Sequence, residues 1–268
     1  MTINTNIAAL NSANDLDAAQ TRLDQSLERL SSGLKINSPS DDPAGLAAAT
    51  RINAEAQGTT AAQSNVANAL SFTQTQDGYL SGISTALSQM SQLAVEAQNQ
   101  TESDSDRSLY DLEFQQLNSY ITSTAAKDFD GVSLFSGSSI EIPLDATNAA
   151  TLNMSGIDLT VGAYADVTSS NIATTAAATS AMAAVQAAIT QLATDRATLG
   201  SYETRLNFAS DQLSVGEQNL TAASSQIEDV NVADESTEYA RDNVLLQSTT
   251  AMLAQANQLP QTVLKLIS

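Results

Sequence analysis

The sequence predicts a mainly α-helical protein, an elongated rod of long antiparallel helices packed like a coiled-coil bundle, with a small β-hairpin element. Three observations support this fold class. Apolar residues recur at steps of three and four, or of seven, over long stretches, which is typical of helices that pack along their length. Alanine dominates the apolar 42% of the 268 residues, while aromatic residues reach 4% and proline numbers only 4, a composition that favours long, closely packed helices. One short stretch, about 138–165, alternates apolar and polar residues with the period of a strand.

Both ends of the chain carry an amphipathic stripe. A helix of about 35 to 40 residues is about 50 to 60 Å long and needs a helical partner along its whole length. Two such helices alone leave apolar surface exposed on a monomer, so packing between molecules is the expected outcome. The residues predicted to form this assembly interface are Ile3, Ile7, Leu10, Leu16, Leu23, Leu27, Leu30, Leu34, Leu245, Met252, Leu259, Val263 and Leu266.

A seven-residue repeat without a miss lies before the C-terminal stripe. Its members are Val185, Leu192, Leu199, Leu206, Leu213, Leu220 and Ile227. The residues three positions later are mostly small, so a partner helix can approach closely along this seam. We expect the partners to lie within the same chain, in helices at 46–97 and 107–125.

Turn-forming residues separate these helices and indicate where each one begins. The stretch from Asn37 to Gly45 is rich in turn formers, and Asp42 is expected to cap a helix that starts at Pro43 and runs to about residue 97. Ser105 or Asp104 is expected to cap the next helix. Residues 165–180, rich in Ser, Thr and Ala, suit a loop or a fraying helix start.

Strand-like alternation follows the second of these helices, at residues 140–144, 152–154 and 157–161, and predicts a hairpin or short sheet. The chain is then expected to form two domains. Residues 1–42 together with 230–268 form a terminal coiled-coil domain, and residues 43–229 form a helical rod domain with the hairpin region at about 138–165.

Composition excludes several classes of function. The chain has no His and no Cys, which rules out zinc sites of the usual kind, Ser-His-Asp or Cys-His nucleophiles, common haem ligands and disulfides. Ten basic residues against 30 acidic ones give a formal charge of −20, which argues against nucleic acid and anionic membranes as partners. There is no 18-residue apolar run, and the first basic residue is Arg22, so neither a membrane span nor a Sec-type signal peptide is expected. The chain is therefore expected to be cytosolic or exported by another route.

The acidic motifs favour turns and solvated helix faces over a site. The sequence from Asp128 to Gly131 has part of a calcium-loop pattern, but position 137 is Gly where the loop needs Glu. No Gly-rich phosphate loop followed by Lys is present. We therefore expect no catalytic, metal or cofactor site.

Several blocks of residues resemble bacterial flagellin. These are the opening MTINTNIAAL, the blocks LSSGLKIN at 30–37 and DDPAGL at 41–46, Leu199-Gly200, Arg205-Leu206, Ser225, Ile227, Asp229, Ala233, Glu235, MLAQAN at 252–257 and Pro260-Gln261. The resemblance covers roughly the first 135 and the last 85 residues. It implies a subunit secreted unfolded through the flagellar type III export channel, which polymerises at the filament tip and whose terminal helices form coiled coils in the filament core. The short middle, roughly 136–180, implies a short form without large outer domains.

The resemblance also implies the partners: other copies of the chain in a homopolymer, the flagellar export chaperone, and the cap and hook-junction proteins. The segment 87–93 aligns with the part of some flagellins that a vertebrate Toll-like receptor recognises. Gln89 and Ser91 replace the basic residues usual there, which argues against such recognition. The alternatives are a hook-filament junction protein, which shares the terminal pattern, and an acidic secreted hydrolase or calcium-dependent binding module.

Overall fold

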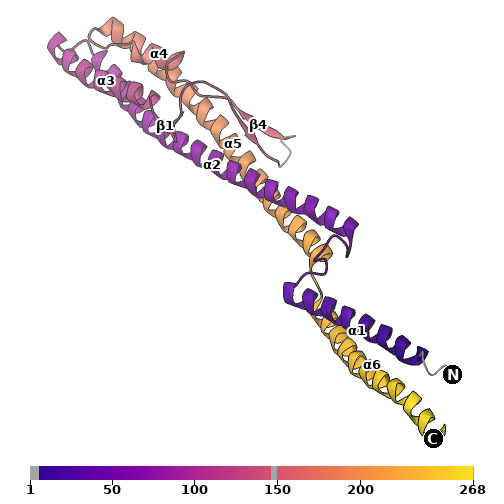
Figure 1. The fold of residues 1–268 in the computed structure, drawn as a ribbon. Coiled ribbons are helices and arrows are strands. Elements are labelled where there is room, and N and C mark those ends of the chain that lie inside the picture. The colour runs from indigo at the N-terminus through magenta and orange to yellow at the C-terminus, as the bar shows by residue number, and fades with distance from the viewer. Residues whose placement is uncertain (1–5, 146–149, 268) are drawn as a thin grey trace. The chain divides into compact units, whose positions relative to one another are not determined.

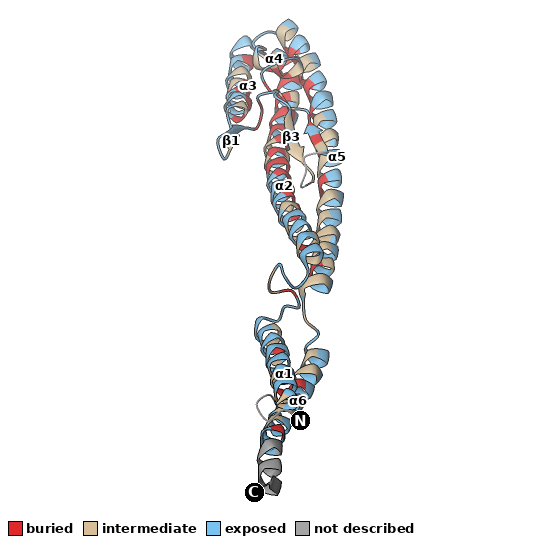
Figure 2. Ribbon diagram, turned by 45° about the vertical axis from the view of Figure 1, so that its right-hand side comes forward, coloured by how far each residue is buried: buried red, intermediate tan, exposed pale blue. Residues whose placement is uncertain are grey.

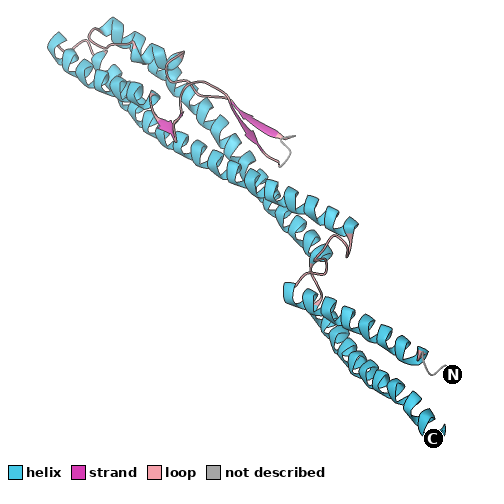
Figure 3. Cartoon of the chain, viewed as in Figure 1, coloured by secondary structure: helices cyan, strands magenta, loops and turns pink. Residues whose placement is uncertain are grey.

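The computed structural model describes residues 6–145 and 150–267, with side chains described up to residue 258. Long helices dominate it (Figures 1 and 3). The elements in chain order are α1 (Ile7–Ser32), α2 (Pro43–Ala97), α3 (Asp104–Ala125), β1 (Asp128–Phe129), β2 (Val132–Ser133), β3 (Ile140–Pro143), β4 (Thr151–Met154), α4 (Ala163–Thr168), α5 (Thr175–Glu228) and α6 (Val232–Ile267). The mainly α fold of long helices with a small β-hairpin is thus confirmed.

The chain divides into two compact units. Unit 1 comprises residues 1–55 and 219–268, and unit 2 comprises residues 56–218. Unit 1 therefore holds α1, α6, the start of α2 and the end of α5.

Unit 2 is built on the antiparallel pairing of α2 and α5. The amide of Gln98, at the end of α2, donates to the carbonyl of Ala178 near the start of α5 at 3.4 Å. Thr60, near the point where α2 enters unit 2, donates to Glu217 of α5 at 3.2 Å. Figure 2 shows many buried positions along α2 and α5 where α3, α4 and β3 lie around them.

The main core of unit 2 joins three helices. Leu80, Ile83, Leu87 and Met90 of α2 are fully buried, and the cluster includes Phe114 and Ile121 of α3 and Val185, Leu192 and Leu199 of α5. The expectation that helices at 46–97 and 107–125 pack with the heptad seam is confirmed for these residues. Apolar side chains at helical spacing form this core because each helix presents one stripe inward.

The β-hairpin of β3 and β4 covers a smaller core. The two strands are antiparallel, with Ile140 opposite Met154 and Ile142 opposite Leu152. Leu152 and Met154 are buried against Val66 and against Leu206 of α5. Residues 157–161, expected as a further strand, do not form one. Ile157 and Leu159 are buried in the main core as irregular chain, and only Asp158 makes an isolated bridge.

A second, two-residue hairpin was not expected from the sequence. β1 and β2 flank Asp130 and Gly131, whose φ angles are 51° and 79°. Two successive positive φ angles are typical of a tight hairpin turn, and Asp-Gly is one of the pairs that adopt it. Turn chemistry at this acidic motif is therefore confirmed.

Helix starts follow the capping chemistry, with one correction. Asp42 accepts hydrogen bonds from the amides of Ala44 and Gly45 at 3.1 and 2.9 Å, so the cap before Pro43 is confirmed. The cap of α3 is Ser103 rather than Ser105 or Asp104, because Ser103 and Asp106 form a reciprocal capping box. Within residues 165–180, α4 extends to Thr168 and α5 begins at Thr175.

Candidate assembly interface

Unit 1 pairs the two ends of the chain as antiparallel helices, which Figures 1 and 2 show side by side. The amide of Asn6, at the start of α1, donates to the carbonyl of Ala256 near the end of α6 at 2.7 Å. Ser26, near the end of α1, donates to Glu235 near the start of α6 at 2.6 Å. The pair is therefore in register along nearly the whole length of α1.

Small residues occupy the buried positions between α1 and α6. Ser12, Ala19 and Ser26 of α1 are buried, as is Ala256 of α6. Small side chains allow two helix backbones to approach closely but contribute little apolar area. The pair therefore buries less apolar surface than the core of unit 2.

Two ion pairs add to the α1–α6 contact. Arg22 lies 3.7 Å from Asp242, whose side chain is only 5% exposed, and Arg29 lies 3.8 Å from Glu235. Removing the partner of a buried carboxylate is strongly destabilising because the charge is left unpaired away from water. Arg22 therefore matters more to this pair than its own exposure suggests.

A short irregular segment follows α1 and forms backbone hydrogen bonds with the chain between α5 and α6. Gly33 ends α1 with a φ of 76°, a left-handed conformation that suits glycine. The amide of Lys35 then donates to the carbonyl of Glu228 at 2.6 Å, and the amide of Val230 donates to the carbonyl of Gly33 at 3.0 Å. Residues of the LSSGLKIN block, 30–37, thus pair with the segment between α5 and α6.

A polar network ties the start of α2 to the end of α5 within unit 1. The amide of Asn53 donates to Glu228 at 3.0 Å, and the hydroxyl of Ser224 donates to Asn53 at 2.7 Å. Ser224 is buried. This network explains why compact unit 1 extends past Pro43 into α2.

The structure separates the predicted assembly residues into two groups. The half-buried leucines on the α6-facing side of α1 are Leu16, Leu23 and Leu30. The residues that stay exposed are Ile7, Leu10, Leu27, Leu34, Leu245 and Met252. Ile3 and the side chains of Leu259, Val263 and Leu266 lie outside the described residues.

Two exposed apolar residues of α6 were missed by the sequence reasoning. Val232 and Val244 are 59% and 65% exposed. Val244 directly precedes the predicted Leu245, and its neighbour at the next turn is polar, so the three-four pattern gave no signal for it. Exposed apolar side chains on α6 thus extend beyond the predicted stripe.

The heptad seam of α5 changes character along its length. Val185, Leu192, Leu199 and Leu206 are at most 3% exposed, whereas Leu213, Leu220 and Ile227 are half-buried. Leu220 and Ile227 lie in unit 1. The seam is therefore a core element in unit 2 and a partly open surface near the end of α5.

Polar side chains hold the loops of unit 2 in place. Asp158 accepts hydrogen bonds from both the amide and the hydroxyl of Thr160, and these bonds lower the pKa of its carboxyl. Burial, together with a 2.7 Å hydrogen bond from its hydroxyl to Asp195, raises the pKa of Tyr164 far above its ordinary value. Tyr164 therefore stays protonated and serves as a donor between the loop region and α5.

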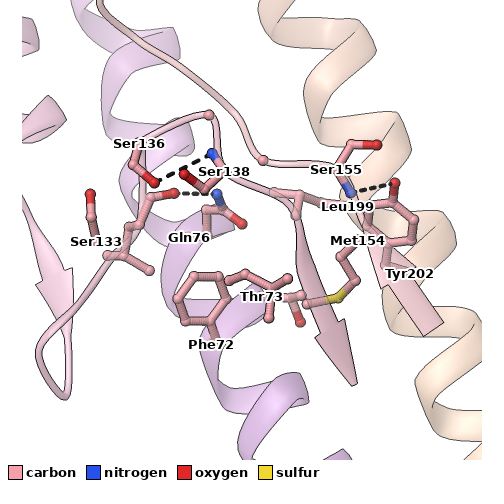
Figure 4. Close-up of a pocket in the computed structure, with 14 residues that line it drawn as sticks. Phe72, Thr73, Gln76, Ser133, Ser136, Ser138, Met154, Ser155, Leu199 and Tyr202 are labelled. Carbon is pink, nitrogen blue, oxygen red and sulfur yellow. Dashed lines mark hydrogen bonds between the residues drawn. The ribbon is translucent and has the colours of Figure 1, made fainter. Parts of the chain in front are cut away.

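A small hollow of about 10 Å³ lies between α2, the hairpin and α5 (Figure 4). Gln76 donates to the carbonyl of Leu134 at 2.6 Å, and the amide of Ser155 donates to the hydroxyl of Tyr202 at 3.0 Å. A space of this size holds about one water molecule. The hollow therefore has no room for a substrate.

Within the part of the chain that the structure describes, no group of three or more acidic side chains is placed to hold a metal ion. The described helices also include none that is long and apolar enough to cross a bilayer. The structure is that of a long-helix protein whose terminal helices, α1 and α6, pair with each other and still expose large apolar side chains. Such surfaces are typical of proteins that pack against other protein molecules.

Comparison with known proteins gives the family. The model of the bacterial flagellin N-terminal helical region matches residues 3–139, and that of the bacterial flagellin C-terminal helical region matches residues 182–267. The chain belongs to the bacterial flagellins.

Individual relatives agree along their whole length. The chain is 33% identical to the flagellin of Bacillus subtilis over 303 residues and 32% identical to that of Halalkalibacterium halodurans over 272 residues, each alignment covering all of both chains. The crystal structure of Bacillus cereus flagellin matches with a TM-score of 0.52 and 30% identity over 56% of this chain and 88% of that one. A putative flagellar hook-associated protein from Vibrio parahaemolyticus, with a TM-score of 0.61 and 18% identity, covers 70% of this chain and 100% of that one and shows the fold alone.

The family defines the function. This chain is a structural subunit of the bacterial flagellar filament, an extracellular assembly that serves motility, and it polymerises with copies of itself. The match along the full length of short flagellins agrees with the expected short form.

Proposed function

We propose that subunits of this flagellin polymerise through the exposed apolar side chains of α1 and α6, while the half-buried leucines between the two helices hold the pair together. The observation that carries this proposal is the exposure of large apolar side chains on helices that are already paired. Ile7, Leu10 and Met252 are 64%, 59% and 58% exposed. Burial of each in a neighbouring subunit would remove apolar surface from water.

The two groups of residues have different roles in this proposal. Leu16, Leu23 and Leu30 stabilise the pair of helices inside one chain, so their loss would weaken unit 1 first. Leu27 and Leu245, at 53% and 39% exposure, would contribute mainly between chains. The proposed interface includes Ile3, Leu34, Leu259, Val263 and Leu266 from the sequence pattern.

We further propose the remaining assignments that the family suggests. The assembly domain comprises residues 1–42 with 230–268, and residues 43–229 form the second domain. The export chaperone, the cap and the hook-junction proteins are proposed partners, and Gln89 and Ser91 argue against binding to the Toll-like receptor. The lack of His and Cys supports the absence of catalytic activity.

Electron microscopy of the purified chain, with and without short filament seeds, tests this proposal. A version that lacks residues 1–30 is run in parallel. Filaments from the intact chain alone are the expected result, because the truncated chain lacks the α1 half of the interface. Filaments from the truncated chain would contradict the proposed interface, and monomers from the intact chain with seeds present would contradict assembly through these exposed side chains.

A further inference from the structure

Unit 2 contains an apolar groove of about 510 Å³ that its own packing leaves open. The groove lies between α2, the β1–β2 turn and the β3–β4 hairpin. Phe72 and Met154 are buried at its base, and Phe72 meets Phe129 edge to face with ring centroids 5.9 Å apart. Val132 stands at the rim and is 51% exposed.

The lining of this groove carries one acidic side chain. Among the described residues that line it, Asp130 carries the only charge, and its backbone has a φ of 51°. The neighbouring Asp128 and Glu141 do not line the groove, because side chains alternate between the two faces along β1 and β3. A partner with an apolar side chain beside a basic one therefore fits this groove.

The same unit presents such a pair on α5. Phe208 is 70% exposed, the highest value among the exposed large apolar side chains described. Its neighbours Leu206 and Ala209 pack under the hairpin, so Phe208 points away from the groove of its own chain. Arg205, three residues earlier, and Asp211, three residues later, are both exposed on the same side of the helix.

We propose that Phe208 of one subunit inserts into the groove of a neighbouring subunit, with Arg205 placed against Asp130. The proposal rests on the function as a filament subunit and names a contact that serves it. A second copy is the occupant because the chain polymerises with itself and because it carries both the groove, with Asp130 in its lining, and the exposed Phe208 with Arg205 beside it, here called the knob.

The knob and the groove lie on different surfaces of unit 2, which suits a polymer that grows at its ends. They lie on different elements of unit 2, so one subunit can use its knob on a second while a third uses its groove. Such a contact between unlike surfaces is heterologous, and it generates helical filaments when the rotation does not close. A contact of this kind would add to the proposed interface of α1 and α6.

Crosslinking tests the contact directly, because the chain has no Cys of its own. Subunits with Asp211→Cys, one turn after Phe208, are mixed with subunits carrying Ser133→Cys, next to Val132. A short thiol-specific crosslinker is added before and after assembly. The expected result is a covalent dimer that forms in filaments and not in monomers, while Ser180→Cys, exposed far along α5, gives none with Ser133→Cys.

Two further variants measure how much the contact contributes. Phe208→Ala is expected to raise the concentration needed for assembly about 30-fold, the effect of truncating an interface hot spot. Arg205→Asp is expected to raise it as well, and combining it with Asp130→Asn, which keeps a residue suited to the positive φ of this turn, is expected to recover part of the assembly. Circular dichroism checks that each variant keeps its helices.

The outcomes separate this contact from the proposed function. Normal filaments without the dimer between positions 211 and 133, unchanged by Phe208→Ala, would overturn the contact and assign the groove to another occupant. Failure of the unaltered chain to form filaments would instead contradict the proposed function itself.

Discussion

Leu27→Asp is the sharpest test of the terminal interface. Leu27 is 53% exposed in unit 1, so about half of its side chain remains to be buried by a neighbouring subunit. Full burial of a leucine contributes about 1.5 to 3 kcal/mol, which leaves about 1 kcal/mol for this contact. An unpaired carboxylate buried in its place costs about 3 kcal/mol more. The sum of about 4 kcal/mol raises the critical concentration for polymerisation about a thousandfold.

The same change has little effect on the monomer. An exposed helical Leu→Asp replacement costs at most about 0.7 kcal/mol in helix propensity, so α1 and α6 stay paired. Sedimentation across a concentration series measures the critical concentration, and circular dichroism monitors the helices. Gln25→Asp is the matched control, because it adds the same charge at an exposed polar position of α1. Equal critical concentrations for the two variants would refute the assignment of Leu27 to the interface.

Three further outcomes are expected. Polymerisation should improve as salt rises, since salt screens repulsion between subunits of charge −20; turbidity at several ionic strengths measures this, and a flat response would exclude charge repulsion as a barrier. Gly156→Ala should lower the free energy of unfolding by about 1 to 3 kcal/mol in urea titrations, because its Cβ would meet the backbone of Ser138, whereas Gly216→Ala, with nothing within 4 Å, should stabilise by about 0.4 to 1 kcal/mol. Because the pKa of Asp158 is lowered below 3.8 by Thr160, its contribution to stability is present above pH 3.8 and is lost as the pH falls through the lowered value. Urea titrations of Asp158→Asn should lack that part of the acid dependence, and an unchanged pH profile would count against it.

The sequence predicted the helices well because their signals are periodic and repeated. The seam from Val185 to Leu206 is buried where the heptad pattern placed it, and Asp42 with Pro43 located the start of α2 through local capping chemistry. Both signals depend on residues close together in the chain. Such local information is present in the sequence itself.

Errors arose where tertiary contacts decide the outcome. Ile157 and Leu159 alternate like a strand, but their burial in the core of unit 2, rather than pairing, explains the alternation. At the candidate interface, periodicity grouped Leu23 with Leu27, although one faces α6 and the other faces outward. The groove and Phe208 were not predicted, because a groove is made by segments far apart in sequence.

The hydrogen bond between Asn6 and Ala256 spans 250 positions of the chain, and this separation has a kinetic consequence. Closing a flexible loop of that length costs about 5 kcal/mol of chain entropy before any contact forms. Once unit 2 has folded, Thr60 and Glu217 already lie together, and only short segments separate the two terminal helices from that point. Folding of unit 2 before the α1–α6 pair would therefore lower the entropy cost of bringing the two terminal helices together.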